Sequence, residues 1–364
     1  MKIVIRTDAS LQIGTGHVMR CLTLAKALKA QGANVSFICR EHIGHLINSI
    51  QQQGFEVFVL PRLPTLTMTR PGQFETEPKL FHADWLGVSQ QEDAAACQNV
   101  LKNELVDWLI IDHYAIDERW QLRLKKAYKK LMVIDDLGDR RHRCDLLLDQ
   151  NYGSMADKYR DLVPSHCTVL TGANYALLRP EFAHWRAVSL KRRQNSGLNT
   201  LLITLGGVDQ DNVTEQILQT LKNTNLSPSL TITVIMGSKA PYLQQITALA
   251  STLQVPTEVR VNVNNMAEVM ANADLAIGAA GATTWERCCL GLPTIQMVIA
   301  ENQKASAQAL AKDQVIKLLD SVADLPGLVA SASDWMQGVS HKASLVCDGL
   351  GVDRVLNQLG LVKK

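Results

Sequence analysis

Residues 2–30 read KIVIRTDASLQIGTGHVMRCLTLAKALKA, and this stretch decides the fold. It opens on the short β-branched run Lys2–Arg6, and an amphipathic segment begins at about His17. A strand that passes through a glycine-bearing turn into a helix is the first half of a βαβ unit. In the amphipathic segment, apolar residues recur at helical spacing, namely Val18, Leu22, Ala25 and Leu28. Gly32 then gives a stop signal for the helix.

The same rhythm continues beyond this unit. Asn34–Arg40 and Glu56–Leu60 have the composition of strands, and residues 43–53 that of a helix between them. We therefore predict an α/β domain over residues 1–190, with a parallel sheet of about six or seven strands covered on both faces. The later strand signals are Trp108–Asp112, Leu131–Asp135, Leu146–Asp149 and Thr168–Leu170.

Residues 61–83 interrupt this alternation. They carry Pro61, Pro64, Pro71 and Pro78 and show no periodicity. Such a stretch is too long for a routine connection in a compact domain. We expect it to lie near a ligand or to act as a lid.

A second α/β unit follows the basic stretch RAVSLKRRQNSGLN (186–199), which has the composition of a linker between domains. We predict a second parallel-sheet domain over residues 199–335, and helices over 336–364 that pack back on the first domain. Parallel sheets bind ligands at the carboxyl ends of their strands, so two such domains facing each other would form a cleft. The strand signals of this unit are Leu201–Leu205, Thr231–Met236, Glu258–Val263, Leu275–Ile277 and Thr294–Val298.

Composition and charge exclude several classes of protein. The chain has 364 residues, of which 46% are hydrophobic and 20% charged, and these values exclude a disordered, collagen-like or coiled-coil chain. The 37 Lys+Arg and 35 Asp+Glu leave a formal net charge of +2, which creates no strong field for nucleic acid or an anionic membrane. We expect neither of these partners, and no obligate protein partner.

Targeting and metal-binding signals are also missing from the sequence. No apolar run reaches the ~20 residues of a bilayer crossing, and Lys2, Arg6 and Asp8 interrupt the position of a signal-peptide core. We therefore expect a cytoplasmic protein. The eight cysteines form no C-x-x-C pair, so we predict reduced, mostly buried thiols and no metal site or cofactor.

The turn after the first strand, DASLQIGTGHVMR (8–20), is the first candidate site. Gly14 and Gly16 let the backbone approach a phosphate or sugar closely, beside the free N–H groups of a helix start. A dinucleotide fingerprint would place a third glycine where Met19 stands, so the match to that motif is weak. His17 lies in the first helical turn, where the helix dipole disfavours the imidazolium ion. A neutral imidazole there can accept a proton, although a packing or capping role is about as frequent.

Several carboxylates follow other strands of the first domain. Asp112-His113-Tyr114 and Asp135-Asp136 come at the carboxyl ends of predicted strands, so they should meet at the edge that carries His17. One of them could orient or polarise the histidine, or hold a sugar hydroxyl. Capping of the next helix explains any single carboxylate at least as well. Only their convergence favours a site.

The strongest local motif is IGAAGATTWER (277–287), a strand that ends in small residues and turns into a helix. Glu286 has two explanations of equal weight. Thr283-x-x-Glu286 fits a capping box, and a carboxylate one turn into the helix can also bind a ribose diol. The backbone amides of the turn, with the helix dipole, would bind pyrophosphate without a metal; they belong to Gly281, Ala282, Thr283 and Thr284.

Two more turns should lie at the same crevice. LGGVD (205–209) follows the first strand of the second domain, and ENQ (301–303) opens a helix just after Val298. Asn302 and Gln303 carry neutral amides that suit sugar hydroxyls or phosphate. Each turn alone is a generic α/β connection.

As a set, these motifs resemble the UDP-2,4-diacetamido-2,4,6-trideoxy-β-L-altropyranose hydrolases of pseudaminic acid biosynthesis, which are related in fold to GT-B glycosyltransferases. The resemblance runs through nearly the whole chain, and a group of spore-coat polysaccharide proteins shares many of the motifs. One variation is Ala280-Gly281-Ala282, where a richer glycine run is common in the family. The motifs are RTDAS and IGTGHVMRCLTLA (6–25), HADWLGVSQQEDA (82–94), IDHYAID (111–117), IDDLGDR (134–140), YALLRPEF (175–182), NMAEVMANADLAIGAAGATTWERCCLGLP (265–293) and AENQ (300–303).

The resemblance implies a GT-B-like fold of two Rossmann-like domains, and hydrolysis of the bond between the anomeric carbon and the UDP oxygen. Water would attack with inversion and without metal, releasing UDP and 2,4-diacetamido-2,4,6-trideoxy-L-altrose for pseudaminic acid biosynthesis and flagellin glycosylation. His17 resembles the family's catalytic histidine. Glu286 would bind the uridine ribose, which favours its functional explanation. Sugar or phosphate contacts are also expected from Asp8, Thr15, Tyr114, Asn302 and Gln303.

Two other functions fit the same residues. A glycosyltransferase would pass the same sugar to a sugar or lipid acceptor, and a membrane-bound acceptor would favour a basic and apolar patch that the sequence does not indicate. A non-catalytic nucleotide-sugar binding protein would leave His17 with a structural role. Release of UDP without an acceptor tests the first alternative, and turnover by a His17 variant tests the second.

Overall fold

The computed structural model describes residues 1–62, 80–102, 104–194 and 197–361. Most of the predicted excursion over 61–83 therefore lies outside the described residues. The chain divides into two compact units, the first formed by Met1–Leu177 with Val352–Lys364 and the second by Leu178–Gly351.

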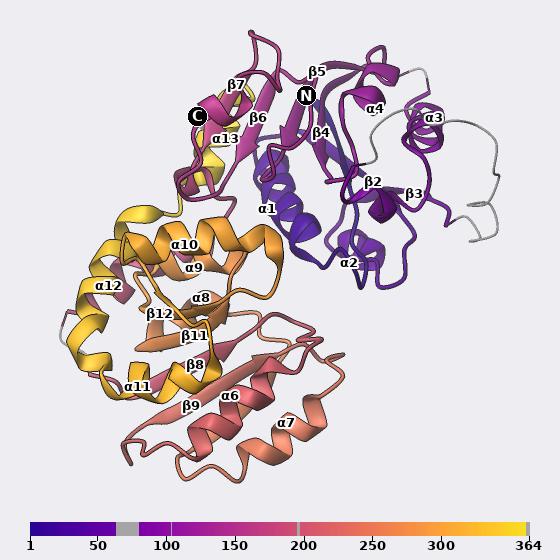
Figure 1. Ribbon diagram of the computed structural model, residues 1–364. Coiled ribbons are helices and arrows are strands. Elements are labelled where there is room, and N and C mark those ends of the chain that lie inside the picture. Colours follow the sequence, from indigo (N-terminus) through magenta and orange to yellow (C-terminus); the bar gives the residue numbers. More distant parts are fainter. Residues whose placement is uncertain (63–79, 103, 195–196, 362–364) are drawn as a thin grey trace. The chain divides into compact units, whose positions relative to one another are not determined.

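The first unit contains a seven-stranded parallel sheet in the order β3-β2-β1-β4-β5-β6-β7 (Figure 1). The α/β fold predicted for this part of the chain is confirmed. The strands are β1 (Lys2–Thr7), β2 (Asn34–Arg40), β3 (Glu56–Leu60), β4 (Val106–Asp112), β5 (Tyr128–Ile134), β6 (Leu146–Asp149) and β7 (Thr168–Thr171), and the helices are α1 (Gly16–Ala30), α2 (Ile47–Gln52), α3 (Gln90–Val100), α4 (Glu118–Arg123) and α13 (Gly351–Gln358).

Alternation along the strands gives this sheet two apolar faces. Successive side chains of a strand point to opposite faces. Ile3 and Ile5 of β1 pack in the cluster that includes residues of α1, α2 and α13, whereas Val4 packs in the cluster that includes residues of α3 and α4. A parallel sheet covered by helices on both sides needs this pattern. Because Val355 and Leu356 lie in the first cluster, the C-terminal segment belongs to the first unit.

The second unit contains a six-stranded parallel sheet in the order β10-β9-β8-β11-β12-β13 (Figure 1). Its strands are β8 (Thr200–Thr204), β9 (Thr231–Met236), β10 (Thr257–Val261), β11 (Leu275–Ala279), β12 (Thr294–Met297) and β13 (Lys317–Leu318). Its helices are α5 (Pro180–Arg192), α6 (Val213–Lys222), α7 (Leu243–Ala250), α8 (Met266–Asn272), α9 (Ala282–Cys289), α10 (Lys304–Lys312), α11 (Leu325–Ala330) and α12 (Ala332–Val346).

The first half of the basic stretch that we predicted as a linker, residues 186–192, lies in helix α5 and belongs to the second unit. Two of its arginines bind carbonyl groups at the ends of other helices, whereas Lys191 is exposed. The Arg193 guanidinium donates to the carbonyl oxygens of Met270 at 2.8 Å and Ala273 at 2.6 Å, at the end of α8. Arg186 donates to Ser344 O at 2.7 Å, near the end of α12. Cations favour helix C-termini, so the unit boundary lies before α5 rather than after it.

The C-terminal helices also divide differently from the prediction. Helix α12 lies in the second unit, where Met336 joins the core with α6 and α11, so the segment that belongs to the first unit begins only at Val352.

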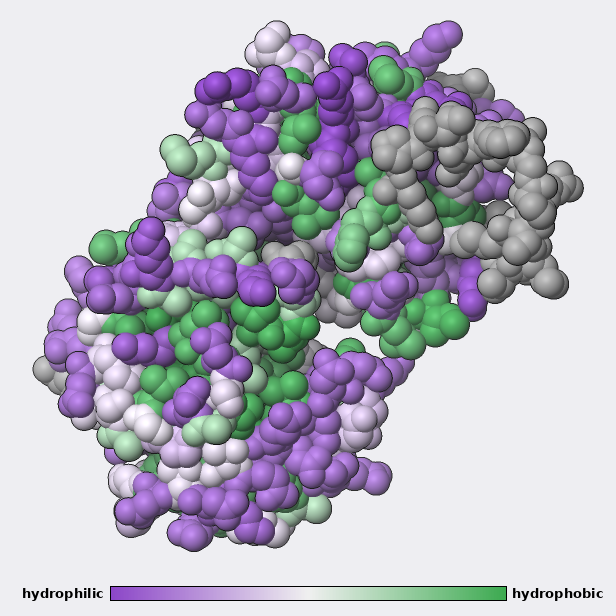
Figure 2. Space-filling view, viewed as in Figure 1, coloured by the Kyte–Doolittle hydropathy of each residue, from purple (hydrophilic) through white to green (hydrophobic). Residues whose placement is uncertain are grey.

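Among the described residues, no helix is long and apolar enough to cross a membrane. The space-filling view shows hydrophilic residues interspersed with smaller apolar areas (Figure 2).

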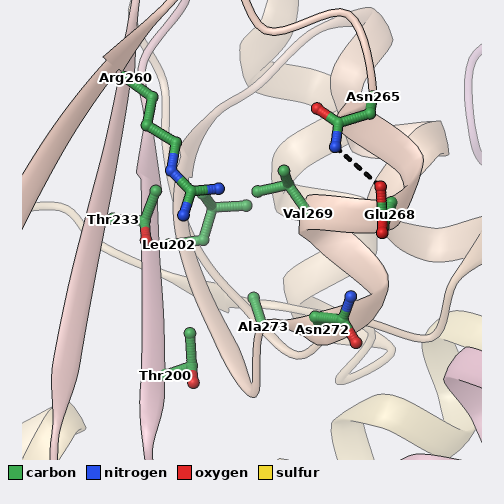
Figure 3. A pocket seen from close by; sticks show the side chains of 9 residues that line it. All are labelled: Thr200, Leu202, Thr233, Arg260, Asn265, Glu268, Val269, Asn272 and Ala273. Atoms are coloured by element: carbon green, nitrogen blue, oxygen red, sulfur yellow. Dashed lines mark hydrogen bonds between the residues drawn. The ribbon is translucent and has the colours of Figure 1, made fainter.

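A hollow of about 260 Å³ lies between α8 and one face of the second sheet (Figure 3). Thr200 and Leu202 of β8, Thr233 of β9 and Arg260 of β10 line it on the sheet side. Thr200 is the first residue of its strand, so the hollow extends toward the amino end of β8. It is separate from the carboxyl-end turns in which the sequence predicts ligand binding.

His142 is a buried histidine of the first unit whose neutral form stabilises the fold. Its Nδ1 accepts a hydrogen bond from Gln121 Nε2 at 2.8 Å, and burial lowers its pKa to about 4. An unfolded histidine titrates near pH 6.5, so between about pH 6.5 and 4 the unfolded chain binds a proton that the folded chain does not. Stability should therefore fall on acidification through this window, by up to about 3 kcal/mol from this residue.

Urea unfolding at about pH 7 and about pH 5 tests this expectation. The His142→Gln variant should lose less stability between the two pH values than the wild type, because glutamine does not titrate. The matched control is His166→Gln, since the side chain of His166 is 65% exposed. Equal losses in the wild type and His142→Gln would contradict the assignment.

Candidate functional site

Both sheets have a switch point, where the chain changes the direction in which it adds strands. In the first sheet it lies between β1 and β4, and in the second between β8 and β11. Ligands of open α/β sheets bind in the crevice at the carboxyl ends of the strands next to this point. His17 follows β1, and Asp112 is the last residue of β4. The turn that ends at Gly281 follows β11.

The turn after β1 is closed by a short bridge between Ser10 and Gly14, with Gly14 N donating to Ser10 O at 2.9 Å. Gly14 has a φ of +79°, which favours glycine. Thr15 precedes α1 without capping it through its side chain, and the first turn of α1 contains no acidic residue. The first N–H groups of α1 thus have neither an intrahelical acceptor nor a side-chain cap. Gly16 and Thr15 are exposed there.

His17 forms a dyad with Asp112, because its Nδ1 lies 2.5 Å from Asp112 Oδ1. Burial opposes ionisation of Asp112, but the charge of Arg20 and the hydrogen bonds from Arg20 and His17 outweigh burial and hold the pKa of this carboxyl well below its usual range. Asp112 is therefore a carboxylate, which can only accept hydrogen bonds. It fixes the tautomer with the proton on Nδ1 and leaves Nε2 of the imidazole able to accept a proton.

Arg20 connects this dyad to the end of the next strand. Its Nε donates to Asp112 Oδ2 at 2.6 Å, and its Nη1 donates to Asp136 Oδ2 at 2.7 Å. The hydroxyl of Tyr114 donates to the same Asp136 oxygen at 2.9 Å. The predicted convergence of carboxylates on His17 thus takes the form of one buried network.

Aromatic rings surround the imidazole. Tyr114 packs edge-on against His17, with ring centroids 4.6 Å apart, and Trp85 lies 6.4 Å from it in the same kind of contact. Trp85 also stacks on Tyr114 at 5.7 Å, and the ring of His82 lies 4.2 Å from that of Trp85. Burial lowers the pKa of His82. With these rings around it, the residue His17 is 8% exposed.

The sequence prediction did not include three side chains of this cluster, namely Arg20, Trp85 and His82. Arg20 lies one helical turn after His17, so its i+3 spacing was a usable signal. Trp85 and His82 come from the motif HADWLG and the short helix Ala83–Leu86, far from His17 in sequence. Only the resemblance marked that motif, since local spacing gives no reason to place it beside α1.

Asp8 does not fit the predicted contact with sugar or phosphate. Its carboxyl group has no exposed surface. Its Oδ1 accepts from Arg6 Nη1 and from Arg40 N, both at 2.6 Å, and its Oδ2 lies 3.2 Å from His113 Nε2. The carboxylate of Asp8 thus connects β1 and β2 through Arg6 and Arg40. It can affect the turn after β1 only indirectly.

In the second unit, Gly281 is the N-cap of α9 with a φ of +118°, and the helix begins at Ala282. The capping box proposed for Thr283 and Glu286 is wrong, because the helix starts before Thr283 and no side chain caps it. Thr283 Oγ1 instead accepts from Arg287 Nη1 at 3.1 Å. Thr284 is buried, and its hydroxyl donates to Gln296 Oε1 at 2.9 Å.

Glu286 and Gln303 lie beside this turn. Glu286 Oε1 is 3.6 Å from Arg179 Nη2. Burial raises the pKa of Glu286, although Arg179 opposes this shift. Gln303 Oε1 accepts a hydrogen bond from Ile299 N at 3.3 Å. The Nε2 of Gln303 lies close to Gly281, at 3.4 Å from the position that a Cβ would take there. Asn302 is in the same short helix, Glu301–Gln303, but its side chain is outside the described residues.

The two units thus carry different chemistry at their switch points. The first holds an imidazole whose tautomer is set by a carboxylate, which is the arrangement of a general base. The second holds a small-residue turn at a helix N-terminus, which suits an anion. Within the described ranges, no group of three or more His, Cys, Asp or Glu side chains is placed to hold a metal ion.

Comparison with known proteins gives a consistent result. Residues 200–337 match the glycosyltransferase family 28 C-terminal domain. The chain is 28% identical over 314 residues to the UDP-2,4-diacetamido-2,4,6-trideoxy-beta-L-altropyranose hydrolase of Campylobacter jejuni, covering 86% of this chain and 97% of that protein. It is 23% identical over 369 residues to the spore coat polysaccharide biosynthesis protein SpsG of Bacillus subtilis, covering 98% and 96%.

The solved structure of MurG from Acinetobacter baumannii has a TM-score of 0.71 to this chain at 16% identity and covers 99% of each chain. With the two Rossmann-like units, this likeness shows the GT-B fold. The similarity over most of the chain and the match to the family 28 domain support the resemblance to the UDP-2,4-diacetamido-2,4,6-trideoxy-β-L-altropyranose hydrolases.

Proposed function

We propose that the chain hydrolyses UDP-2,4-diacetamido-2,4,6-trideoxy-β-L-altropyranose to UDP and the free 2,4-diacetamido sugar, with His17 as the general base. The relative from Campylobacter jejuni is named as a hydrolase of this UDP-sugar. The observation that carries the proposal is the 2.5 Å contact between His17 Nδ1 and Asp112 Oδ1. It leaves Nε2 as the proton acceptor.

In the proposed reaction, Nε2 of His17 takes a proton from a water molecule as the water oxygen attacks the anomeric carbon. The attack comes from the face opposite the UDP oxygen, so the configuration inverts. The bond between the anomeric carbon and that oxygen breaks, and its electron pair leaves with UDP. The imidazolium formed is stabilised by Asp112 and returns its proton to solvent. Assistance by a positioned general base contributes roughly 10²–10⁴-fold to the rate.

UDP is a good leaving group when its charge is stabilised. We assign the diphosphate to the N–H groups of the turn at the start of α9, Gly281–Thr284, where the helix dipole adds a partial positive charge. Gln303 and Asn302 would add amide contacts, and Glu286 would accept from the uridine ribose. In the first unit, the amides of Gly14, Thr15 and Gly16 would contact the sugar or phosphate.

Purified protein incubated with the UDP-sugar in ¹⁸O-water, without an acceptor, tests the reaction. We expect release of UDP, ¹⁸O at the anomeric carbon of the free sugar, and the inverted anomer at early times by NMR. ¹⁸O in the UDP phosphate would instead mean that water attacked phosphorus and that the bond between phosphorus and the bridging oxygen was cleaved. Absence of UDP release would contradict hydrolysis.

A glycosyltransferase is the second candidate, because residues 200–337 match the glycosyltransferase family 28 C-terminal domain. A transferase would use the hydroxyl of a sugar or lipid acceptor in place of water, with the same base. It would release little UDP in the assay above until an acceptor is added. The acceptor-free rate therefore separates the two enzymes.

Glu286 gives a test of the nucleotide half of the site. Replacing Glu286 by alanine should weaken UDP binding about 10- to 100-fold, because hydrogen bonds to charged groups contribute roughly 1.5–3 kcal/mol. Burial raises the pKa of Glu286, so UDP affinity should decline at a higher pH on acidification than it would with an ordinary glutamate. Isothermal titration with UDP, across pH, measures both effects.

The matched control is Glu181→Ala, because Glu181 Oε1 lies 3.0 Å from Nη1 of the same arginine that approaches Glu286. This variant should keep the UDP affinity of the wild type. A lower melting temperature of Glu286→Ala with unchanged UDP affinity would show that the residue is only structural.

A further inference from the structure

Arg287 of α9 is a buried cation, and its guanidinium contacts the turn at the start of this helix from the interior of the unit. The residue is 1% exposed, and in the part of the chain that the structure describes no carboxylate forms an ion pair with it, although the charge of Glu286 acts on it from a greater distance. Burial lowers its pKa to about 10, so it remains charged at neutral pH. Charged side chains are almost never fully buried without a partner, so the position of Arg287 calls for a compensating anion.

The neutral groups around the guanidinium hold it in one orientation. Nη2 donates to Ala279 O at 2.8 Å and to Gln296 Oε1 at 3.1 Å, and Nη1 donates to Thr283 Oγ1 at 3.1 Å. Nε has no hydrogen-bond partner among the described residues. A Cβ on Gly278 would lie 2.5 Å from Nη1, so only glycine at that position leaves room for the guanidinium.

These contacts determine what the turn can offer a ligand. Thr283 Oγ1 accepts from Arg287, and its own hydroxyl proton is therefore available for donation elsewhere. Ala282 and Thr283, the first residues of α9, have N–H groups without intrahelical acceptors. The turn thus combines amide donors and a hydroxyl donor with a whole positive charge behind them, in a region of low dielectric where charge interactions are strong.

We propose that Arg287 is a positioning residue for the diphosphate of the nucleotide, whose negative charge compensates the guanidinium and whose oxygens receive the hydroxyl proton of Thr283. The inference rests on the proposed function, since it takes the turn as the diphosphate site. It predicts that binding depends on the number of phosphates, because each phosphate adds charge for Arg287 to attract. The uridine part should not depend on Arg287.

Isothermal titration with UDP, UMP and uridine tests this role in four proteins: the wild type, Arg287→Gln, Arg287→Lys and Thr283→Val. Arg287→Gln removes the charge and should weaken UDP binding roughly 10- to 100-fold, UMP binding less, and uridine binding not at all. Arg287→Lys keeps the charge and should retain most of the preference for UDP over uridine. Thr283→Val should lose roughly fivefold to tenfold for UDP only, since one hydrogen bond is lost.

The control is Arg192→Gln, because Arg192 of α5 has its own carboxylate partner, with Nη1 2.6 Å from Asp274 Oδ1. It should bind all three ligands as the wild type does. Equal losses for UDP and uridine in Arg287→Gln, or full UDP affinity in it, would overturn the inference. If Arg287→Gln does not fold, loss of the UDP preference in Arg287→Lys would overturn it equally. A wild type that binds no UDP would instead overturn the proposed function.

Discussion

Replacing His17 by asparagine is expected to lower kcat for UDP release by roughly 10²–10⁴-fold, the contribution of a positioned general base. Asparagine retains a polar side chain of similar reach, so it can still bind Asp112, but it cannot take a proton from water. The nucleotide is assigned to the second unit, so the Kd for UDP should be unchanged. Stopped assays of UDP release and titration with UDP measure the two quantities.

The chain offers a matched control in a histidine–aspartate pair whose histidine is exposed. His166 Nε2 lies 3.5 Å from Asp145 Oδ1, and the side chain of His166 is largely exposed. His166 lies just before β7, and Asp145 just before β6. His166→Asn removes an imidazole that faces a carboxylate, so it should keep the turnover of the wild type. Full turnover by His17→Asn would contradict the mechanism and favour a nucleotide-sugar binding protein in which His17 is structural.

The fold was predictable because its signals are local. β-Branched runs such as Lys2–Arg6, each followed by an amphipathic stripe, indicate strands and helices directly, and the regular alternation indicates a parallel sheet. The order of both sheets places the turns after β1 and β11 at switch points, so the two strongest motifs of the sequence coincide with the expected ligand positions.

The unit boundary was not predictable in the same way. The basic residues of 186–199 have the composition of a solvated linker, but Arg186 and Arg193 donate to carbonyls at helix ends in the second unit. Whether a cation faces water or a helix C-terminus depends on distant elements, since the carbonyls bound by Arg193 and Arg186 lie 80 and 158 residues away in sequence. Composition within a window contains no information about such a partner.

The candidate site shows the same division. Spacing identified His17, and strand ends identified Asp112 and Asp136 as residues that could converge on it. The partner of the histidine was left open, because only the register of β1 against β4, with Thr7 beside Asp112, decides which carboxylate meets the imidazole. Asp8 was expected at the ligand from the resemblance to the hydrolases, whereas Arg6 and Arg40 hold it in the interior.

Replacing Asp112 by asparagine is expected to lower kcat by roughly 10²–10⁴-fold while the imidazole itself stays in place, because loss of the carboxylate removes control of the tautomer. The amide of asparagine can donate to Nδ1, and that contact would put the proton on Nε2, where it blocks acceptance from water. Measured kcat and UDP affinity should separate, with kcat lowered and the Kd for UDP unchanged. Asp145→Asn, the carboxylate of the exposed pair, is the control.

Stability needs a second variant, because Asp112 is also the bidentate partner of Arg20, through Oδ2 at 2.6 Å and Oδ1 at 2.7 Å. Breaking a buried pair by removing one partner costs about 3–5 kcal/mol when the other charge is left uncompensated. Arg20 keeps Asp136 as a partner, at 2.7 Å, so we expect Asp112→Asn to cost less than this. The double variant Asp112→Asn with Arg20→Gln removes the charges of both residues and should recover part of that stability, because Asp136 then loses its arginine partner. Its turnover should remain low, because no carboxylate sets the proton on Nδ1. Recovery of turnover together with stability would mean that Asp112 acts only through the fold and that His17 finds its tautomer without it.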